Sequence, residues 1–231
     1  RARQLSVTGY WEWVLGELRD KSLMHAVTEL DAVTGALFAR NAYNTEFAGR
    51  TAFVDCSETS RSVTADRTEF LGRNGSAASP AALRRVRLSG RFGAGLDPCA
   101  AIQVPVTVED GETKEVIFIL GVGADEEQAR QLVNRFRGIA SAHRALEGVW
   151  HYWSHALGAV YFETPDPAVD FLANGWLVYQ TLACRMWART GYYQSGGAFG
   201  FRDQLQDAMA LVHAEHGLLR EHLLRAGRAR A

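Results

Sequence analysis

The sequence predicts an α+β multidomain protein, with an N-terminal antiparallel β-sandwich, a helical linker and a second, helical domain. Before residue 124, short segments alternate apolar and polar side chains with the period of two that is typical of half-buried strands. After that point apolar residues recur with helical spacing, and the breaker Thr164–Pro167 interrupts the pattern. We therefore expect a β-sandwich domain at 1–123, a helical linker at 124–163 and the beginning of a helical domain at 164–231.

The strands are predicted first. The segments with the strand pattern are Leu5–Trp13, Ala26–Leu30, Ala36–Ala39, Thr51–Cys56, Ile102–Val108 and Glu115–Val122. In the first of them the alternation predicts one buried face. Gly35 and the Asp-Gly pair at 110–111 predict turns between the strands that flank them. The interval Asp66–Gly95 has no regular period, so we expect long loops there, with one helical turn at Pro80–Arg85.

Caps and breakers divide the second part into helices. Asp125 is a suitable N-cap, and Glu126 and Glu127 follow it in the first turn, where the helix dipole favours negative charge. Asp166 and Pro167 are typical of another N-terminus. The predicted helices are 126–140, Ala145–Leu157, Pro167–Arg189, Arg202–His213 and Leu218–Ala226. The third is apolar all round, which is typical of a helix inside a larger helical assembly.

Composition excludes several classes of protein. The net charge of -1 and the dispersed basic residues argue against a nucleic-acid binder. No apolar run approaches the roughly 20 residues of a membrane span, and the N-terminus has neither a signal-peptide pattern nor an initiator Met. We therefore expect a piece of a longer protein, without a membrane span of its own. Cys56, Cys99 and Cys184 lack metal-site spacing, so we expect free thiols in a reducing, cytoplasmic compartment.

Two groups of histidines have the composition of a metal site. His151 and His155 are four apart on a predicted helix, a spacing that can present two imidazoles to zinc. His213, Glu215 and His216 are close together in the sequence. For the first pair we favour structural histidines, and for the second group a solvated helix end. No metal site is predicted.

Two loop segments are candidates of a different kind. Gly93–Gly95 follows no βα unit, so it does not match the dinucleotide fingerprint and predicts no nucleotide cofactor. Arg67, Glu69, Arg73 and Asn74 form a polar cluster on an apparent loop. Such a cluster either binds a ligand or contains an Arg–Glu pair that joins the loop to its sheet.

The stretch Gly191–Asp207 is the strongest candidate for a binding site. An aromatic, glycine-rich loop containing Tyr192 and Tyr193 leads into a set of polar residues. That set is Arg202, Asp203, Gln206 and Asp207. Glycines allow a close approach of the backbone, aromatic rings offer flat faces, and guanidinium, amide and carboxylate groups are directional donors and acceptors. The mixture suits a hydroxyl-rich ligand such as a sugar, although a helix–helix connection with a capping Arg–Asp pair would show the same composition.

The residues Gly200–Asp207 resemble a motif of the cellobiose-phosphorylase-like glycoside phosphorylases. Asn41–Phe47, Asp66–Gly75 and Trp176–Arg189 support the resemblance, which is to the phosphorylase-like C-terminal region of cyclic β-1,2-glucan synthases in particular. The likeness extends from about Ser6 to about Leu224.

The resemblance implies an N-terminal β-sandwich, a helical linker and the first helices of an incomplete (α/α)6 barrel. It implies inverting phosphorolysis of β-1,2-glucan in the intact parent protein, with inorganic phosphate as co-substrate and no other cofactor. Arg202, Asp203 and Asp207 would hold hydroxyls of the donor sugar, with Gln206 and Tyr193 as further substrate-binding candidates. The general acid and the phosphate-binding residues of the family lie downstream of this motif. We therefore assign no catalytic residue and expect the fragment to be inactive alone.

Two other functions remain open from the sequence: a non-catalytic carbohydrate-binding or scaffolding module, and an inverting glycoside hydrolase. A β-glucan oligosaccharide is the expected partner in each case. The parent protein would be attached to the inner membrane through other domains. Because Trp176, Leu177 and Leu182 would lack partner helices, we also expect self-association into homo-oligomers.

Overall fold

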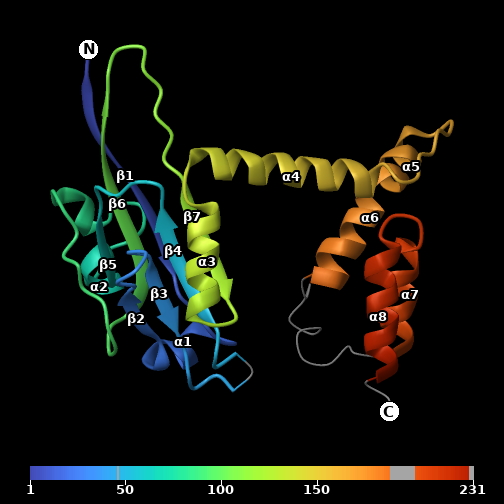
Figure 1. The fold of residues 1–231 in the computed structure, drawn as a ribbon, viewed down its shortest axis with the longest axis horizontal. Coiled ribbons are helices and arrows are strands. Elements are labelled where there is room, and N and C mark those ends of the chain that lie inside the picture. Colours follow the sequence, from blue (N-terminus) through green and yellow to red (C-terminus); the bar gives the residue numbers. More distant parts are fainter. Residues whose placement is uncertain (46, 188–200, 229–231) are drawn as a thin grey trace. The chain divides into compact units, whose positions relative to one another are not determined.

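A computed structural model describes residues 1–45, 47–187 and 201–228, and it divides into two compact units, Arg1–Ala145 and Leu146–Ala231. The first unit contains two antiparallel sheets, with strand orders β1-β6-β5 and β2-β3-β4-β7 (Figure 1). Its strands are β1 (Arg3–Glu12), β2 (Val27–Leu30), β3 (Leu37–Arg40), β4 (Thr51–Cys56), β5 (Ser62–Asp66), β6 (Pro98–Val108) and β7 (Phe118–Gly123). Its helical segments are α1 (Arg19–Ser22), η1 (Leu23–His25), α2 (Arg67–Leu71), η2 (Ala81–Arg84) and α3 (Glu126–Phe136).

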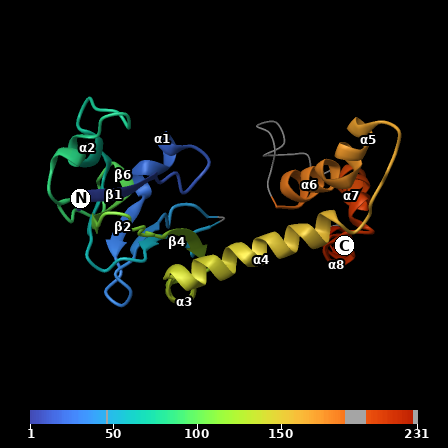
Figure 2. The same ribbon diagram turned by 90° about the horizontal axis from the view of Figure 1, so that it is seen from above.

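The two sheets pack face to face, and each also carries helical cover on its outer face. Alternate residues of β4 and β6, including Val54 and Ile102, point into the core between the sheets. The intervening Phe53 packs against α3, whereas Ala101 packs against Phe70 of α2. Figure 2 shows α2 and α3 on opposite sides of the sheets. The predicted β-sandwich is confirmed as two antiparallel sheets packed face to face. Every residue of β4 is buried because the other sheet packs on one face of this strand and α3 on the other.

Several predicted elements are confirmed. The range of β4 matches the predicted strand, and β2 pairs with β3 across a turn in which Gly35 has a φ of 70°. A positive φ of this kind is readily adopted by glycine. The helical turn expected at Pro80–Arg85 is present as η2, and Asp125 caps α3 by accepting a hydrogen bond from the Gln128 N–H.

The turn predicted at Asp110-Gly111 is present, but it does not join two strands of one sheet. The strands on its two sides, β6 and β7, belong to different sheets, so the connection crosses the sandwich. The local turn is real, since Gly111 has a φ of 77°. A turn signal fixes only the local backbone, however, and the pairing partners of β6 are β1 and β5.

The expectation of one buried face along β1 holds only for its second half. Leu5 and Val7 are 53% and 40% exposed, although Trp11 and Trp13 belong to the core between the sheets. The first half of β1 pairs with β6 over Arg3–Val7, but Leu5 and Val7 are not among the buried residues of the core between the sheets. The alternation therefore predicted the strand, but not how much of its apolar face is buried.

Gly138 sets the boundary between the first two long helices, which differs from the predicted one. α3 ends at Phe136, Arg137 is extended, and Gly138 follows with a φ of 103° immediately before α4 (Ile139–Leu157) begins. We expected the first helix to continue to about residue 140 and the second to start at Ala145. The helical spacing of apolar residues continues across Gly138, so this periodicity does not reveal the end of the helix.

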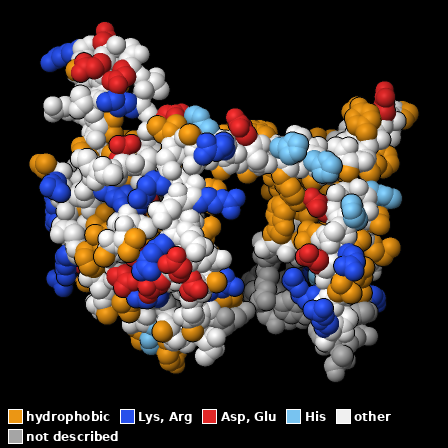
Figure 3. Space-filling view, in the orientation of Figure 1, with side chains coloured by type: hydrophobic (Ala, Val, Ile, Leu, Met, Phe, Trp, Pro, Cys, Tyr) orange, Lys and Arg blue, Asp and Glu red, His pale blue; other side chains and the backbone are white. Residues whose placement is uncertain are grey.

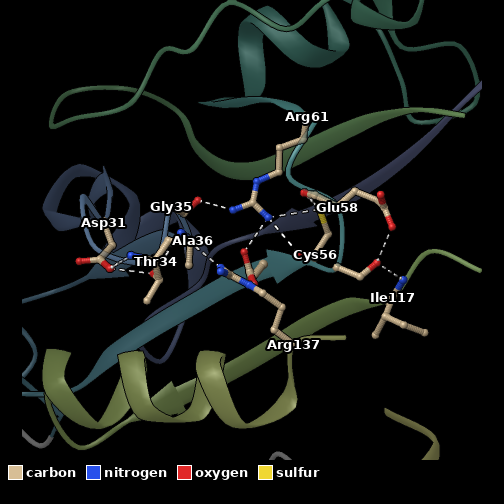
Figure 4. Close-up of polar contacts among 11 residues, drawn as sticks. Asp31, Thr34, Gly35, Ala36, Cys56, Glu58, Arg61, Ile117 and Arg137 are labelled. Atoms are coloured by element: carbon tan, nitrogen blue, oxygen red, sulfur yellow. Dashed lines mark hydrogen bonds and ion pairs between the residues drawn. The ribbon is translucent and has the colours of Figure 1, made fainter. Parts of the chain in front are cut away.

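A buried polar network ties α3 to the sheet beneath it (Figure 4). Asp55 in β4 is fully buried, and its Oδ2 accepts a hydrogen bond of 2.7 Å from Arg137 Nε. Arg61 Nη1 lies 2.7 Å from the other carboxylate oxygen, in an ion pair that lacks hydrogen-bond alignment. The two guanidinium groups also donate to the carbonyls of Thr34 and Gly35, each at 2.6 Å. The network joins the end of α3, the turn before β3 and the end of β4.

The second unit is helical. After the rest of α4 come α5 (Pro167–Phe171), η3 (Leu172–Trp176), α6 (Leu177–Gln180), η4 (Thr181–Trp187), α7 (Phe201–Ala208), η5 (Met209–Leu211) and α8 (His216–Arg228). From Pro167 to Trp187 the backbone is continuously helical, with π-helical turns in η3 and η4. Its small core contains Ala156, Leu182, Ala208, Leu211 and Leu219. The expectation that Leu182 lacks partners is therefore wrong, because α4, α7, η5 and α8 enclose it. Within the described residues, no helix has both the length and the hydropathy to cross a membrane.

Candidate functional site

The polar motif singled out in the sequence lies on α7. Arg202, Gln206 and Asp207 are exposed residues of this helix. Position 203 also belongs to α7, but the Asp203 side chain lies outside the described part of the structure. Tyr193 and the glycine-rich loop around it lie outside the described residues as well.

Asp207 is held in place by an arginine from the preceding helical stretch. Arg185, in η4, donates from Nε to Asp207 Oδ2 at 2.5 Å, and its Nη2 contacts the same oxygen. The Asp207 side chain is 48% exposed and that of Arg185 23%. One carboxylate oxygen is thus fixed by a charge-assisted contact, and the side chain remains open to solvent.

Sequence reasoning did not identify Arg185 as a site residue. The signal was available, because Arg185 is the first charged residue after Asp170 in a long apolar helix. A lone charge in such a setting is expected to have a partner. The partner lies 22 positions away in the sequence, and no local spacing indicates it.

His222 of α8 adds a titratable group to the same region. Burial and the positive charges of Arg225 and Arg185 lower the pKa of His222 below its ordinary value. Its Nε2 is buried and has no hydrogen-bond partner among the described residues. The imidazole is therefore kept neutral over a wider pH range than a solvated histidine.

Aromatic rings line the helices next to this polar group. Tyr152 and Trp153 of α4 pack against Trp187, and Trp153 also packs against Tyr179, with ring centroids 5.3–5.7 Å apart. Trp176 stacks on Tyr179. Burial and a hydrogen bond to Glu215 raise the pKa of Tyr152 to about 12. Most of these rings form packing contacts with one another.

Trp176 and Tyr179 also belong to an open cavity of about 510 Å³. Phe171, Asn174 and Asp170 line it as well. Aromatic faces beside an amide and a carboxylate can accommodate the apolar and polar surfaces of a sugar ring. The part of the unit that is described can therefore offer sugar-compatible groups at two places, α7 and this cavity.

The loop cluster around Arg67 is structural. Asp66 caps α2, and Arg67 pairs with Glu12 of β1 at 2.8 Å. Glu69 accepts a hydrogen bond from Thr64 and pairs with Arg85 at 2.7 Å. The cluster therefore joins its segment to the sheet, as one of the two alternatives predicted. The pairs are Arg67 with Glu12 and Glu69 with Arg85, however, and not a pair between two members of the cluster. The remaining members of the predicted cluster, Arg73 and Asn74, are exposed.

The structure also shows the surroundings of the other residues that the sequence singled out. The Gly93 N–H donates to Thr28 Oγ1 at 3.0 Å, so this glycine segment is tied to β2. His151, His155, His213 and His216 are all exposed. Across residues 1–45, 47–187 and 201–228, no three His, Cys, Asp or Glu side chains are grouped to hold a metal ion. Cys56, Cys99 and Cys184 are free thiols, as expected.

Comparison with known proteins adds two family matches. Residues 1–139 match the model for the glycosyl hydrolase 94 supersandwich domain. Residues 152–230 match the model for the glycosyl hydrolase 94 superfamily catalytic domain. The boundary between the two matches falls within α4.

Individual relatives are similar over different lengths. The chain is 40% identical to the cyclic β-(1,2)-glucan synthase NdvB of Rhizobium meliloti over 97% of its own length and 8% of that protein. It is 24% identical to the N,N'-diacetylchitobiose phosphorylase of Vibrio furnissii over 96% of its own length and 28% of that protein. It is 25% identical to the cellobionic acid phosphorylase of Neurospora crassa, covering 78% and 23% of the two chains. The chain thus spans less than a third of each of these relatives.

Proposed function

Because the chain belongs to the glycosyl hydrolase 94 family, we propose that it is part of a larger protein that acts on β-1,2-glucan by inverting phosphorolysis. The observation that carries the proposal is the 40% identity to a cyclic β-(1,2)-glucan synthase over nearly the whole chain. The sheet unit corresponds to the supersandwich match, and the helices after it correspond to the start of the catalytic domain. In this proposal those helices begin an (α/α)6 barrel.

The proposed reaction uses inorganic phosphate as co-substrate and no other cofactor. A phosphate oxygen attacks the anomeric carbon of the terminal glucose, the bond from that carbon to the glycosidic oxygen breaks, and a carboxylic acid protonates the departing oxygen. The product is glucose 1-phosphate with inverted configuration. The residues proposed here bind the substrate, and no residue of this chain is assigned as the acid.

The α7 residues would hold the donor sugar. Arg202 can donate to sugar hydroxyl oxygens, whereas Asp207 can accept hydrogen bonds from sugar hydroxyl groups. Arg185 contacts Asp207 at Oδ2, so this pairing does not involve Oδ1, the oxygen that would accept such a bond. Asp203, Gln206 and Tyr193 complete the proposed set.

The test is phosphate-dependent release of glucose 1-phosphate from β-1,2-gluco-oligosaccharides by the parent protein. In that protein Asp207→Asn should lower kcat/KM by about 10- to 150-fold, which corresponds to about 1.5–3 kcal/mol for a lost hydrogen bond to a charged group. Glu221→Gln, an exposed carboxylate of α8, is the matched control and should leave the rate unchanged.

The outcomes separate the alternatives. Glucose release that does not depend on phosphate would indicate a hydrolase and overturn the phosphorolytic proposal. We propose that the 231-residue chain is inactive alone, because it spans only 28% of a related phosphorylase. Turnover by this chain would contradict that statement.

A further inference from the structure

We propose that the sheet unit itself carries a saccharide-binding site, in which the stacked rings of His25 and Tyr43 form a platform for a neutral glucan chain. The rings line an open pocket of about 850 Å³ at one end of the sheet that contains β2, β3, β4 and β7. No part of the proposed phosphorolysis requires this pocket.

The sheet register brings the two rings together. His25 ends η1, one residue before β2 begins, and Tyr43 follows β3. Val27 of β2 pairs with Arg40 of β3, so the chain enters and leaves this strand pair at neighbouring points. On the other side of the pocket, Thr51 of β4 pairs with Gly123 of β7, which leads directly to the first turn of α3.

The aromatic pair has the geometry of a binding platform. The His25 and Tyr43 ring centroids are 4.1 Å apart and the ring planes differ by 12°. His25 supports one face of the Tyr43 ring, and Tyr43 is 74% exposed. An exposed, flat aromatic surface next to a pocket is suited to the apolar C–H face of a pyranose ring.

Tyr43 is held on a fixed backbone. Asn41 is buried, and its Oδ1 accepts a hydrogen bond of 3.0 Å from the Tyr43 N–H. Its Nδ2 donates to the Leu15 carbonyl at 2.9 Å. One buried amide thus links the Tyr43 backbone to the segment after β1, and binding therefore requires less ordering of this loop.

The charges of the pocket favour a neutral ligand over an anion. Three carboxylates, Asp125, Glu126 and Glu127, line it together with two arginines, Arg40 and Arg130. Both arginines already pair with carboxylates: Arg40 contacts Glu29 and Glu126, and Arg130 contacts Asp31, Glu126 and Glu127.

Glu127 is 68% exposed at the first turn of α3 and can accept hydrogen bonds from ligand hydroxyls. Phosphate or another anion would meet an excess of negative charge. A glucan offers hydroxyl donors to these carboxylates and a C–H face to the Tyr43 ring.

The experiment measures binding of fluorescently labelled gluco-oligosaccharides to the 231-residue chain by thermophoresis. Probes with β-1,2, β-1,3 and β-1,4 linkages are tested separately, so the result does not depend on the linkage proposed for the parent enzyme. At least one should bind saturably, and Tyr43→Ala should weaken that binding about tenfold. Tyr43→Phe retains the ring and should bind within about twofold of the unchanged chain.

Two control variants locate the site. Tyr161→Ala removes another exposed tyrosine, in the second unit, and should have no effect. Asp207→Ala is the second variant, because it separates binding at the proposed α7 site from binding at the His25–Tyr43 platform. Because Tyr43 is exposed, the thermal unfolding of Tyr43→Ala should match that of the unchanged chain, which excludes misfolding as the cause of a loss.

Each contrary result has a distinct meaning. If Asp207→Ala abolishes binding and Tyr43→Ala does not, the sugar binds at α7, which overturns this proposal and supports the proposed function. If no probe binds, the platform proposal is wrong, while phosphorolysis by the parent protein remains a separate measurement.

Discussion

Asp55 in β4 and Asp207 in α7 each meet an arginine that is far away in the sequence. Asp55 is fully buried and lies between Arg61 and Arg137, whereas Asp207 is about half exposed and faces Arg185. A buried carboxylate between two guanidinium groups stabilises one arrangement of the chain, because removing it leaves unpaired charges in the interior. A half-exposed pair contributes less to stability and leaves the carboxylate available to a ligand.

Asp55→Asn should therefore destabilise the sheet unit by about 3–5 kcal/mol, because Arg61 and Arg137 lose their shared counter-charge. Hydrogen exchange of the β4 and β7 amides measures the change locally. Glu29→Gln is the matched control: it breaks the more exposed ion pair with Arg40 at 2.8 Å and should cost about 1 kcal/mol or less. Equal effects of the two substitutions would contradict the network interpretation.

His222 should make the helical unit less stable under mildly acidic conditions. Its pKa is lower in the folded chain than in the unfolded chain, so the unfolded state binds more protons as the pH falls through the ordinary value of 6.5. Stability from this group is complete above that pH and is lost below it. His222→Gln should reduce the fall in Tm between about pH 7.5 and 5.5. An unchanged pH profile would show that the group titrates normally.

These residue pairs show which parts of the candidate sites could be predicted from the sequence and which could not. Asp207 and its neighbours were found because a charged, amide-containing motif follows a glycine-rich loop. Arg185 and Arg137 were not found, since their partners are 22 and 82 positions away. His25 and Tyr43 were not found either, because the pairing of β2 with β3 brings them together and neither residue is unusual by itself.

At the scale of elements, glycines with positive φ decide where segments end. Gly138 and Gly148 form a natural comparison, because an added Cβ would meet no atom within 4 Å at either position. Gly138 has a φ of 103° between α3 and α4, whereas Gly148 lies inside α4. Any difference between their substitutions should therefore come from the backbone and not from packing.

Gly138→Ala should destabilise the chain by about 1–2 kcal/mol, because alanine is strained at this φ. Gly148→Ala should stabilise it by about 0.5–1 kcal/mol, because alanine favours the helical backbone. Urea unfolding of the two variants in parallel measures both changes. A stabilising effect at Gly138 would mean that the helix boundary lies elsewhere.

The elements that the sequence did not predict share a physical cause. β5 was not predicted, because Ser62–Asp66 is short and polar at three of its five positions. Its place is fixed by β6, which pairs with it over Ser62–Thr64, and by α2 on its outer face. The crossing between β6 and β7 was also missed, because a turn signal cannot say which strands will pair. Tertiary pairing decides both cases.

At the scale of the whole chain, the two units differ in how well they are covered. The sheet unit has apolar cores on both faces of each sheet, whereas α5, η3 and α6 expose Phe171, Trp176 and Leu177 by 71%, 46% and 55%. Hydrophobic side chains are visible on the surface of this helical stretch in Figure 3. The change from strands to helices was predictable from periodicity, but the degree of cover was not, because it depends on which segments pack together.

The exposed helical stretch should cause self-association of the 231-residue chain. The double variant Phe171→Ser and Leu177→Ser should sediment closer to the monomer than the unchanged chain in a concentration series. Val86→Ser removes an isolated exposed residue of the sheet unit, 95% exposed, and is the control. A monomer at all concentrations in the unchanged chain would contradict the prediction.

The three thiols differ in accessibility between the two units. Cys56 and Cys99 are buried in the sheet unit, and burial together with nearby carboxylates raises the pKa of Cys99. Cys184, in the helical unit, is partly accessible. A thiol reagent should modify Cys184 first and reach the other two only when the sheets open, because the thiolate is the reactive form. The labelling rates of Cys56 and Cys99 would therefore time the opening of the sheet unit in the unsubstituted chain, with the faster reaction of Cys184 as an internal reference.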